Sequence, residues 1–176
     1  MTLLLGPPLP QAYNLETTGG AVGDAFMRDI APVASVVPYV AVVGNHEVAA
    51  TFGHFIARWG GMATLATNSN STSPLWFSFD DGLVHFIGVN TELYYYGPGP
   101  DVAKQIAWLK ADLAAIDRAK TPWVIVLAHK QGWMDSSSGN GGSVKDLEAL
   151  LDSTADLYFG EFECMRMCPC LCSACK

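Results

Sequence analysis

The chain has 176 residues, half of them hydrophobic and only 15% charged, which is enough to build one domain with a buried core and argues against disorder. Its net charge of −7 argues against nucleic acid as a partner, and the composition indicates no basic face for a membrane surface. The sequence has no apolar run as long as a membrane span. Residues 1–10 contain three consecutive leucines without a basic segment before them, so we expect no secretory signal peptide there.

The first predicted helix follows an irregular lead-in, residues 1–12. Apolar residues from Val22 to Val33 recur at spacings of four, four and three, which is typical of an amphipathic helix. Proline lacks the backbone N–H that a helix interior needs. We therefore expect Pro32 to kink this helix or to end it near Ala31.

A polar triplet follows the next predicted element. Residues 39–43 are apolar or aromatic, which predicts a buried strand that ends at Gly44. Asn45, His46 and Glu47 come directly afterwards, and ligands of open α/β sheets bind beyond the carboxyl ends of strands. An amide oxygen can coordinate a metal ion, and an imidazole can coordinate one or transfer a proton. The same triplet is also compatible with an ordinary polar loop after a strand.

A hairpin is predicted in the middle of the chain. Residues 52–59 indicate a short helix, and residues 67–73 indicate a polar loop. Residues 76–79 and 83–89 favour strands and flank a short turn that contains glycine, which is typical of a β-hairpin. His85 lies within the second of these runs, where a strand residue on one face of the sheet is favoured over a ligand.

A second helix and strand precede another candidate residue. Residues 94–100 predict a loop, and Asp101 is a candidate cap for the helix that follows it. Residues 123–128 form a second fully apolar run that ends at His129, which repeats the pattern of a buried strand followed by a ligand-type residue. The helix between them has an apolar stripe made of Val102, Ile106, Leu109, Leu113 and Ile116.

The last third of the body continues the alternation of helix and strand. Residues 131–143 are rich in glycine and serine and predict a loop, residues 144–151 predict a short helix, and residues 155–159 predict a last strand. Helices alternate with apolar strands apart from the one hairpin. The predicted fold class is therefore α/β, with a mixed β-sheet and flanking helices.

Several motifs in this order resemble a known family. VVGNHE and, further along, WVIVLAH resemble the calcineurin-like metallophosphoesterases, specifically the purple acid phosphatases. The resemblance continues through SPLWFSFDDGLVHFIGVNTE and covers roughly Ala12 to Phe159. It implies a partial metallophosphoesterase-like layered fold over residues 13–160, followed by a Cys-rich tail at residues 161–176.

The resemblance implies a metal-dependent phosphomonoester hydrolase of the acid phosphatase type. In that family an iron ion and a second divalent metal (Zn, Mn or Fe) share a bridging carboxylate and a hydroxide that attacks phosphorus. Two adjacent cations neutralise the phosphate and lower the pKa of bound water. The implied partner is a phosphate monoester substrate, and the family suggests a secreted or lytic compartment.

The family's functional residues can be carried over at four positions. Asn45 and His129 match two ligands of the divalent metal. His46 matches the histidine that contacts the phosphate or the leaving group. Tyr13 matches the tyrosine whose phenolate binds iron, although it is also compatible with simple packing.

Both ends of the matched region depart from the family pattern. The family's first Gly-Asp-x-Gly motif has no counterpart, and Pro10 stands where the bridging aspartate belongs. Gly160 is followed by Glu161-Phe162-Glu163 instead of by two histidine ligands. Glu161 and Glu163 could supply oxygen ligands instead. Because cations held close without a bridging carboxylate repel each other, the alternative is a catalytically inactive fragment or pseudoenzyme of the family.

The tail raises a third possibility. All five cysteines of the chain lie in its last part, at Cys164, Cys168, Cys170, Cys172 and Cys175, so the body cannot depend on internal disulfides. The last four could bind Zn²⁺ or Cu⁺ through their thiolates, which would make the chain a thiol-rich metal-binding protein. Their spacing lacks a pair of C-x-x-C motifs, so reactive or accidental cysteines are the competing interpretation.

Overall fold

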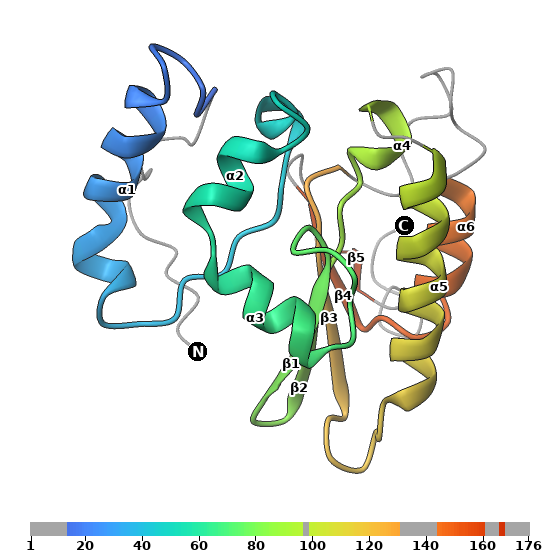
Figure 1. The fold of residues 1–176 in the computed structure, drawn as a ribbon. Helices are drawn as coiled ribbons and strands as arrows, with labels where there is room; N and C mark the ends of the chain where they lie inside the picture. The colour runs from blue at the N-terminus through green and yellow to red at the C-terminus, as the bar shows by residue number, and fades with distance from the viewer. Residues whose placement is uncertain (1–13, 97–98, 131–143, 161–165, 168–176) are drawn as a thin grey trace, which may run out of the picture.

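The computed structural model describes residues 14–96, 99–130, 144–160 and 166–167. Its helices are α1 (Ala21–Ala34), the 3-10 turn η1 (Asn45–Glu47), α2 (Gly53–Arg58), α3 (Gly61–Asn68), α4 (Leu93–Tyr96), α5 (Gly99–Ala115) and α6 (Val144–Leu151). The sheet lies between α2 and α3 on one side and α5 and α6 on the other (Figure 1). The predicted α/β layering with flanking helices is confirmed.

The sheet is mixed and follows the order β1-β2-β3-β4-β5. β1 (Phe77–Asp81) and β2 (Val84–Gly88) form the predicted antiparallel hairpin. β2 is parallel to β3 (Trp123–Leu127), which is parallel to β4 (Leu157–Phe159). β5 (Arg166–Met167) is antiparallel to β4. The carboxyl ends of β2, β3 and β4 therefore meet at one edge of the sheet.

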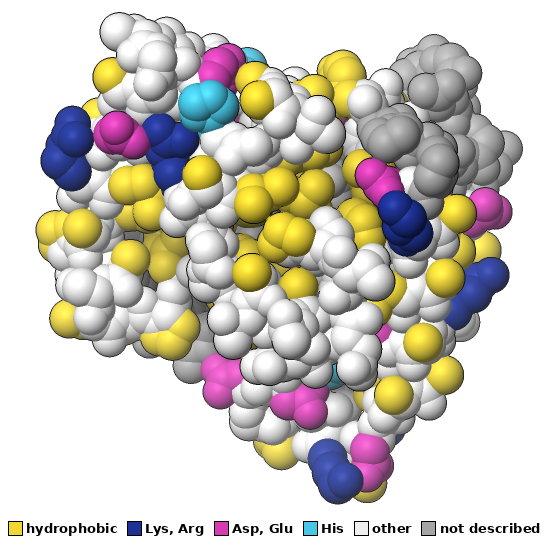
Figure 2. Space-filling view, in the orientation of Figure 1, with side chains coloured by type: hydrophobic (Ala, Val, Ile, Leu, Met, Phe, Trp, Pro, Cys, Tyr) yellow, Lys and Arg dark blue, Asp and Glu magenta, His cyan; other side chains and the backbone are white. Residues whose placement is uncertain are grey.

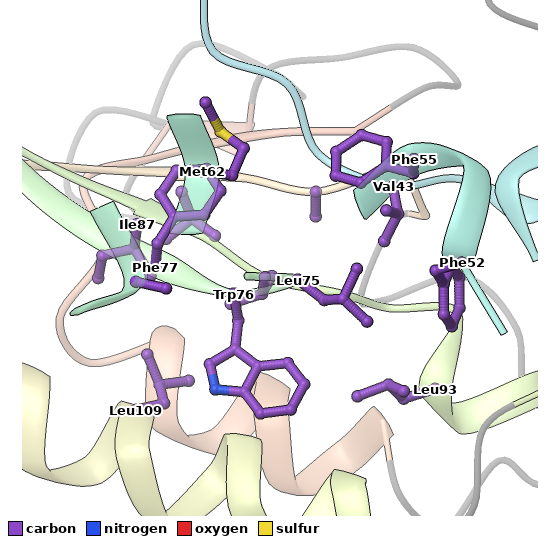
Figure 3. Close-up of a cluster of buried hydrophobic side chains, with 14 of the residues drawn as sticks. Val43, Phe52, Phe55, Met62, Leu75, Trp76, Phe77, Ile87, Leu93 and Leu109 are labelled. Carbon is purple, nitrogen blue, oxygen red and sulfur yellow. The ribbon is translucent and has the colours of Figure 1, made fainter. Parts of the chain in front are cut away.

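The core fills both faces of this sheet. Figure 3 shows Phe55 and Met62, from α2 and α3, over one face, and Trp76 pointing toward Leu109 of α5 on the other. These four side chains are at most 6% exposed. The predicted stripe of α5 packs inward around Leu109, and the apolar burial that results is the main driving force for folding.

Helix boundaries differ from the predictions at several points. α1 continues to Ala34 in spite of Pro32, because the proline lies near the helix end and the N–H of Ser35 still reaches the carbonyl of Ala31 at 2.9 Å. α3 was not predicted. Asp101 does not precede α5 as a cap but lies inside its first turn, where it pairs with Lys104 at 2.8 Å.

One predicted loop contains a helix. The predicted loop at residues 94–100 begins with α4, because the carbonyl of Glu92 accepts the N–H groups of Tyr95 and Tyr96. The predicted loop at residues 131–143 and all five cysteines lie outside the described residues. Among the described helices, none is long and apolar enough to span a bilayer.

Charged groups are spread over the surface. On the face drawn in Figure 2, acidic and basic side chains lie mostly toward the margins, and hydrophobic and uncharged side chains cover the middle. On this face, the described acidic residues therefore do not form one continuous patch, although the net charge of the chain is negative.

Residues 39–43 do not form the predicted strand. They have no assigned strand pairing, although Val43 is fully buried in the core. An open pocket of about 290 Å³ is lined by Val40 and Val42 together with Leu127 and Phe159. The segment therefore lies beside the sheet, but it does not pair with β3 or β4 at the roughly 4.8 Å spacing of neighbouring strands.

Gly44 is the point at which this segment meets the sheet. A Cβ atom built on Gly44 would lie 2.9 Å from Nδ1 and 3.0 Å from Cε1 of the His129 ring. Protein interiors are close-packed and leave no room for such an overlap. A residue without a side chain is therefore required where the backbone passes the imidazole.

His85 connects the hairpin to α5. Its Nδ1 lies 2.6 Å from Oδ1 of Asp80 in β1, and its Nε2 lies 3.0 Å from Oδ2 of Asp112 in α5. The hydroxyl of Ser78 donates a hydrogen bond to Asp112 at 2.5 Å. Burial by itself lowers the pKa of His85, but the hydrogen bonds and charges of the two aspartates outweigh burial and raise that pKa. His85 is therefore the strand residue that was predicted, with a structural role between two layers.

Gly44→Ala should lower the free energy of unfolding by about 1–3 kcal/mol, because the new methyl group displaces the His129 ring or the backbone. Urea unfolding followed by tryptophan fluorescence measures this change. Gly60→Ala is the matched control, because φ is −54° there and a Cβ would meet no described atom within 4 Å. The control should be neutral or stabilising by less than about 1 kcal/mol. Equal losses in both variants would contradict the close packing of Gly44.

His85 should stabilise the fold more at mildly acidic pH than at alkaline pH. A pKa that is raised on folding gives stability that is fully present below the ordinary imidazole value of about 6.5 and is lost as pH rises through the folded value. Urea unfolding of the wild-type chain and of His85→Gln, at about pH 5.5 and about pH 8.5, tests this. The substitution should cost more at the lower pH, and an equal cost at both would refute the prediction.

Candidate functional site

Two of the predicted ligand residues come together at the carboxyl edge of the sheet. Nε2 of His129, which follows β3, lies 3.0 Å from Oδ1 of Asn45 in η1, although 84 residues separate them. The N–H of Ala128 donates to the carbonyl of Phe159 at 2.9 Å, so pairing with β4 holds the chain up to the residue before His129. The ring is thereby presented just beyond the end of the sheet.

The turn that carries Asn45 is closed by its own hydrogen bonds. The carboxylate of Glu47 accepts the N–H of Gly44 at 2.9 Å, and the N–H of Glu47 donates to the carbonyl of Gly44 at 3.2 Å. The Glu47 carboxylate thus makes one half of a capping box, and the backbone carbonyl of Gly44 takes the place of the missing side-chain acceptor. It fixes the direction in which Asn45 and His46 leave the backbone.

Asn45 contacts His129, whereas His46 contacts Asn14. Its Nδ1 lies 3.0 Å from Oδ1 of Asn14, which brings the segment before α1 against η1. A ring held by one nitrogen keeps a fixed orientation, which a group that meets a substrate needs. Tyr13, the remaining predicted site residue, lies outside the described residues, as do Pro10, Glu161 and Glu163.

Sequence reasoning missed a buried carboxylate next to this pair. Glu92 is fully buried, and its Oε1 lies 3.9 Å from Nε2 of His129 while its Oε2 lies 3.8 Å from Nζ of Lys130. The signal that could have found it is the polar run Asn90-Thr91-Glu92 after β2, which repeats the pattern of a polar triplet after an apolar run at Asn45. In the sequence analysis that run enters only through the family resemblance.

Buried hydrogen bonds fix the loop that holds Glu92. The side-chain amide of Gln105 makes two hydrogen bonds to the backbone of Asn90: its oxygen accepts the N–H at 2.7 Å, and its nitrogen donates to the carbonyl at 3.1 Å. The side chain of Asn90 accepts the N–H of Glu92 at 2.9 Å. Burial raises the pKa of the neighbouring Tyr94 to about 12, so its phenol stays protonated. Polar groups that are buried and bonded in this way form a rigid layer.

The loop after β3 is fixed from the same side. The N–H of Lys130 donates to Oγ1 of Thr91 at 3.0 Å, and its carbonyl accepts the hydroxyl of Tyr158 at 2.6 Å. Nζ of Lys130 lies 5.0 Å from the centre of the Tyr95 ring. The loops that follow β2 and β3 are therefore joined to each other and to β4.

The pair of Asn45 and His129 fits one divalent cation in part. An amide oxygen and an imidazole nitrogen are ligands that Zn²⁺, Mn²⁺ and Fe²⁺ accept. The two atoms are hydrogen-bonded at 3.0 Å, and this is also the separation of two ligands that lie about 2.1 Å from one cation at a right angle. Among the described residues, however, no group of three or more His, Cys, Asp and Glu side chains could hold a metal ion. These residues therefore do not assemble a two-metal centre.

Comparisons with known proteins identify the family of the chain. A family model for calcineurin-like phosphoesterases matches residues 17–160. The chain is 35% identical over 159 residues to acid phosphatase type 7 of Homo sapiens, a match that covers 84% of this chain and 34% of that protein. It is 35% identical over 148 residues to purple acid phosphatase 23 of Arabidopsis thaliana, which covers 81% and 27%.

A solved structure resembles the fold. It is that of purple acid phosphatase PPD1 from yellow lupin (Lupinus luteus) seeds, with a TM-score of 0.53 and 26% identity over 81% of this chain and 28% of the lupin chain. The chain thus spans about a third, or less, of the length of these relatives. Because the family model matches most of its residues, the chain belongs to the calcineurin-like phosphoesterase family and is homologous to part of the purple acid phosphatases.

Proposed function

We propose that this chain acts on phosphate monoesters as a metal-dependent hydrolase of the acid phosphatase type. The observation that carries the proposal is the 3.0 Å contact between Asn45 and His129, two residues that match metal ligands of the family. They follow separate segments and converge at the edge of the sheet where α/β proteins bind ligands. The names of the relatives, acid phosphatase and purple acid phosphatase, support the same substrate class.

Each residue has a separate task in this proposal. Asn45 and His129 would hold a divalent cation, which supplies positive charge to the phosphate and lowers the pKa of bound water. His46 would contact the phosphate or give a proton to the leaving alcohol. Asn14 keeps the His46 ring in one orientation through the 3.0 Å contact to Nδ1.

A specific observation favours a second candidate function, which is binding of phosphate esters without hydrolysis. The described residues hold no carboxylate and histidine cluster for a second metal, and the sequence has Pro10 where the family has its bridging aspartate. Family chemistry needs both cations. A member that holds one cation would bind the phosphate and turn it over slowly or not at all.

Hydrolysis of p-nitrophenyl phosphate by the purified chain separates these two functions. The assay is run at mildly acidic pH with iron and zinc supplied. Activity should fall by about 100-fold or more in the double variant Asn45→Ala/His129→Ala, because a cation that polarises the phosphate and its water is lost. Lys120→Ala changes an exposed side chain between α5 and β3, serves as a control for purification and should match the wild type.

Wild-type activity no higher than that of the double variant would end the hydrolase proposal. The second candidate would then be tested by calorimetry with inorganic phosphate and Mn²⁺. Binding that requires Asn45 and His129 would support a phosphate-binding protein without turnover.

His46→Gln should lower kcat by about 10²–10⁴-fold, because glutamine cannot transfer a proton at the leaving group. Affinity for Mn²⁺ should stay within about twofold of the wild type, since His46 is not among the residues that hold the cation in this proposal. Steady-state kinetics and a Mn²⁺ titration measure the two quantities. Asn14→Ala should lower kcat by less, because it only frees the ring. Loss of Mn²⁺ binding in His46→Gln would contradict the assigned role.

A further inference from the structure

Glu92 is a carboxylate whose position is set before any ligand arrives. Its side chain is fully buried, its N–H donates to Asn90, and its carbonyl starts α4 by accepting the N–H groups of Tyr95 and Tyr96. A buried carboxylate is costly unless positive charge or hydrogen-bond donors accompany it. Glu92 lies beside two such groups, Lys130 and His129.

The two oxygens of Glu92 face different cationic or coordinating groups. Oε2 lies 3.8 Å from Nζ of Lys130, whereas Oε1 lies 3.9 Å from Nε2 of His129. Nε2 is the same ring nitrogen that lies 3.0 Å from Oδ1 of Asn45. A carboxylate that only oriented a metal-binding histidine would instead bond the other ring nitrogen. Glu92 and Asn45 therefore converge on one atom of His129.

The separations of Asn45 and Glu92 from His129 are each compatible with two ligands of one cation. Ligands that each lie about 2.0–2.2 Å from a cation are at most about 4.4 Å apart, when they stand on opposite sides of it. The distances of 3.0 Å and 3.9 Å from Nε2 of His129 both fall within this limit. An imidazole, an amide oxygen and a carboxylate make a ligand set that Mn²⁺, Zn²⁺ or Fe²⁺ accepts.

We propose that Glu92 supplies a carboxylate ligand to a divalent cation that Asn45 and His129 also hold. The inference rests on the cation site of the proposed function and adds a ligand that the family pattern does not assign to this position. The carboxylate gives the site a negative charge, which neither Asn45 nor His129 provides. Lys130 then competes with the cation for Glu92, because both are attracted to the same carboxylate.

Mn²⁺ binding to the full chain tests the proposal without substrate. Free Mn²⁺ is counted by its electron paramagnetic resonance signal near neutral pH, and Mn²⁺ is chosen because it prefers oxygen and nitrogen to the thiolates of the tail. Glu92→Gln, which keeps the size of the side chain, should weaken binding by about tenfold or more. Asp101→Asn, which removes a carboxylate from α5, should leave the affinity within about twofold of the wild type.

Lys130→Met decides between a ligand and a partner in an ion pair. If Glu92 binds the cation, removal of the competing ammonium should strengthen Mn²⁺ binding by severalfold. If Glu92 serves only to hold Lys130, Lys130→Met should weaken binding as much as Glu92→Gln does, and the proposal falls. Where Glu92→Gln fails to fold, which circular dichroism would reveal, the direction of the change in Lys130→Met relative to the wild type decides alone: stronger Mn²⁺ binding supports the proposal and weaker binding overturns it.

The remaining outcomes are also decisive. Wild-type affinity in Glu92→Gln, or a wild-type chain that binds no Mn²⁺, overturns the proposal. Failure of the proposed function is a separate result, because it is seen as absent hydrolysis of p-nitrophenyl phosphate. A chain that binds Mn²⁺ through Glu92 but hydrolyses nothing would support the ligand assignment and the non-catalytic candidate together.

Discussion

The parallel pairing of β2, β3 and β4 is the constraint on which the rest of this structure depends. Parallel strands place their carboxyl ends at one edge, so the residues that follow them meet there whatever their distance in sequence. Glu92 follows β2, and His129 follows β3. The register between these strands is fixed by buried side chains such as Ile87 and Val126, and a slip of one residue would turn them away from the core.

The two ends of the parallel strands serve different purposes. Near the amino end of β2, His85 joins this strand to α5 through two aspartates, and this cluster holds the layers together. At the carboxyl ends, the loops after the strands carry Glu92 and His129, which converge with Asn45. A fixed scaffold at one end allows the loops at the other end to present polar side chains in a defined geometry, since loops carry function and the elements beneath them supply rigidity.

The candidate site is more than a pair of exposed ligands. A layer of buried, hydrogen-bonded groups lies beneath it, including Asn90, Gln105 and Glu92. The hydrogen bonds of Gln105 to the Asn90 backbone, and of the Asn90 side chain to the Glu92 N–H, hold this loop in place. The backbone at Gly44 passes close to the His129 ring. Together these contacts limit how far the ligand groups can move.

The sequence by itself determined the alternation of helices and strands, the hairpin and the polar residues at two segment ends, because hydrophobic periodicity and turn residues are local properties. It also predicted Asn45 and His129 as a functional pair. It did not predict that residues 39–43 stay outside the sheet, since their apolar composition suits a strand but pairing depends on where β3 and β4 lie. Glu92 was missed for a related reason. Only the tertiary structure decided its role, because a glutamate after a strand becomes notable when folding buries its charge beside His129.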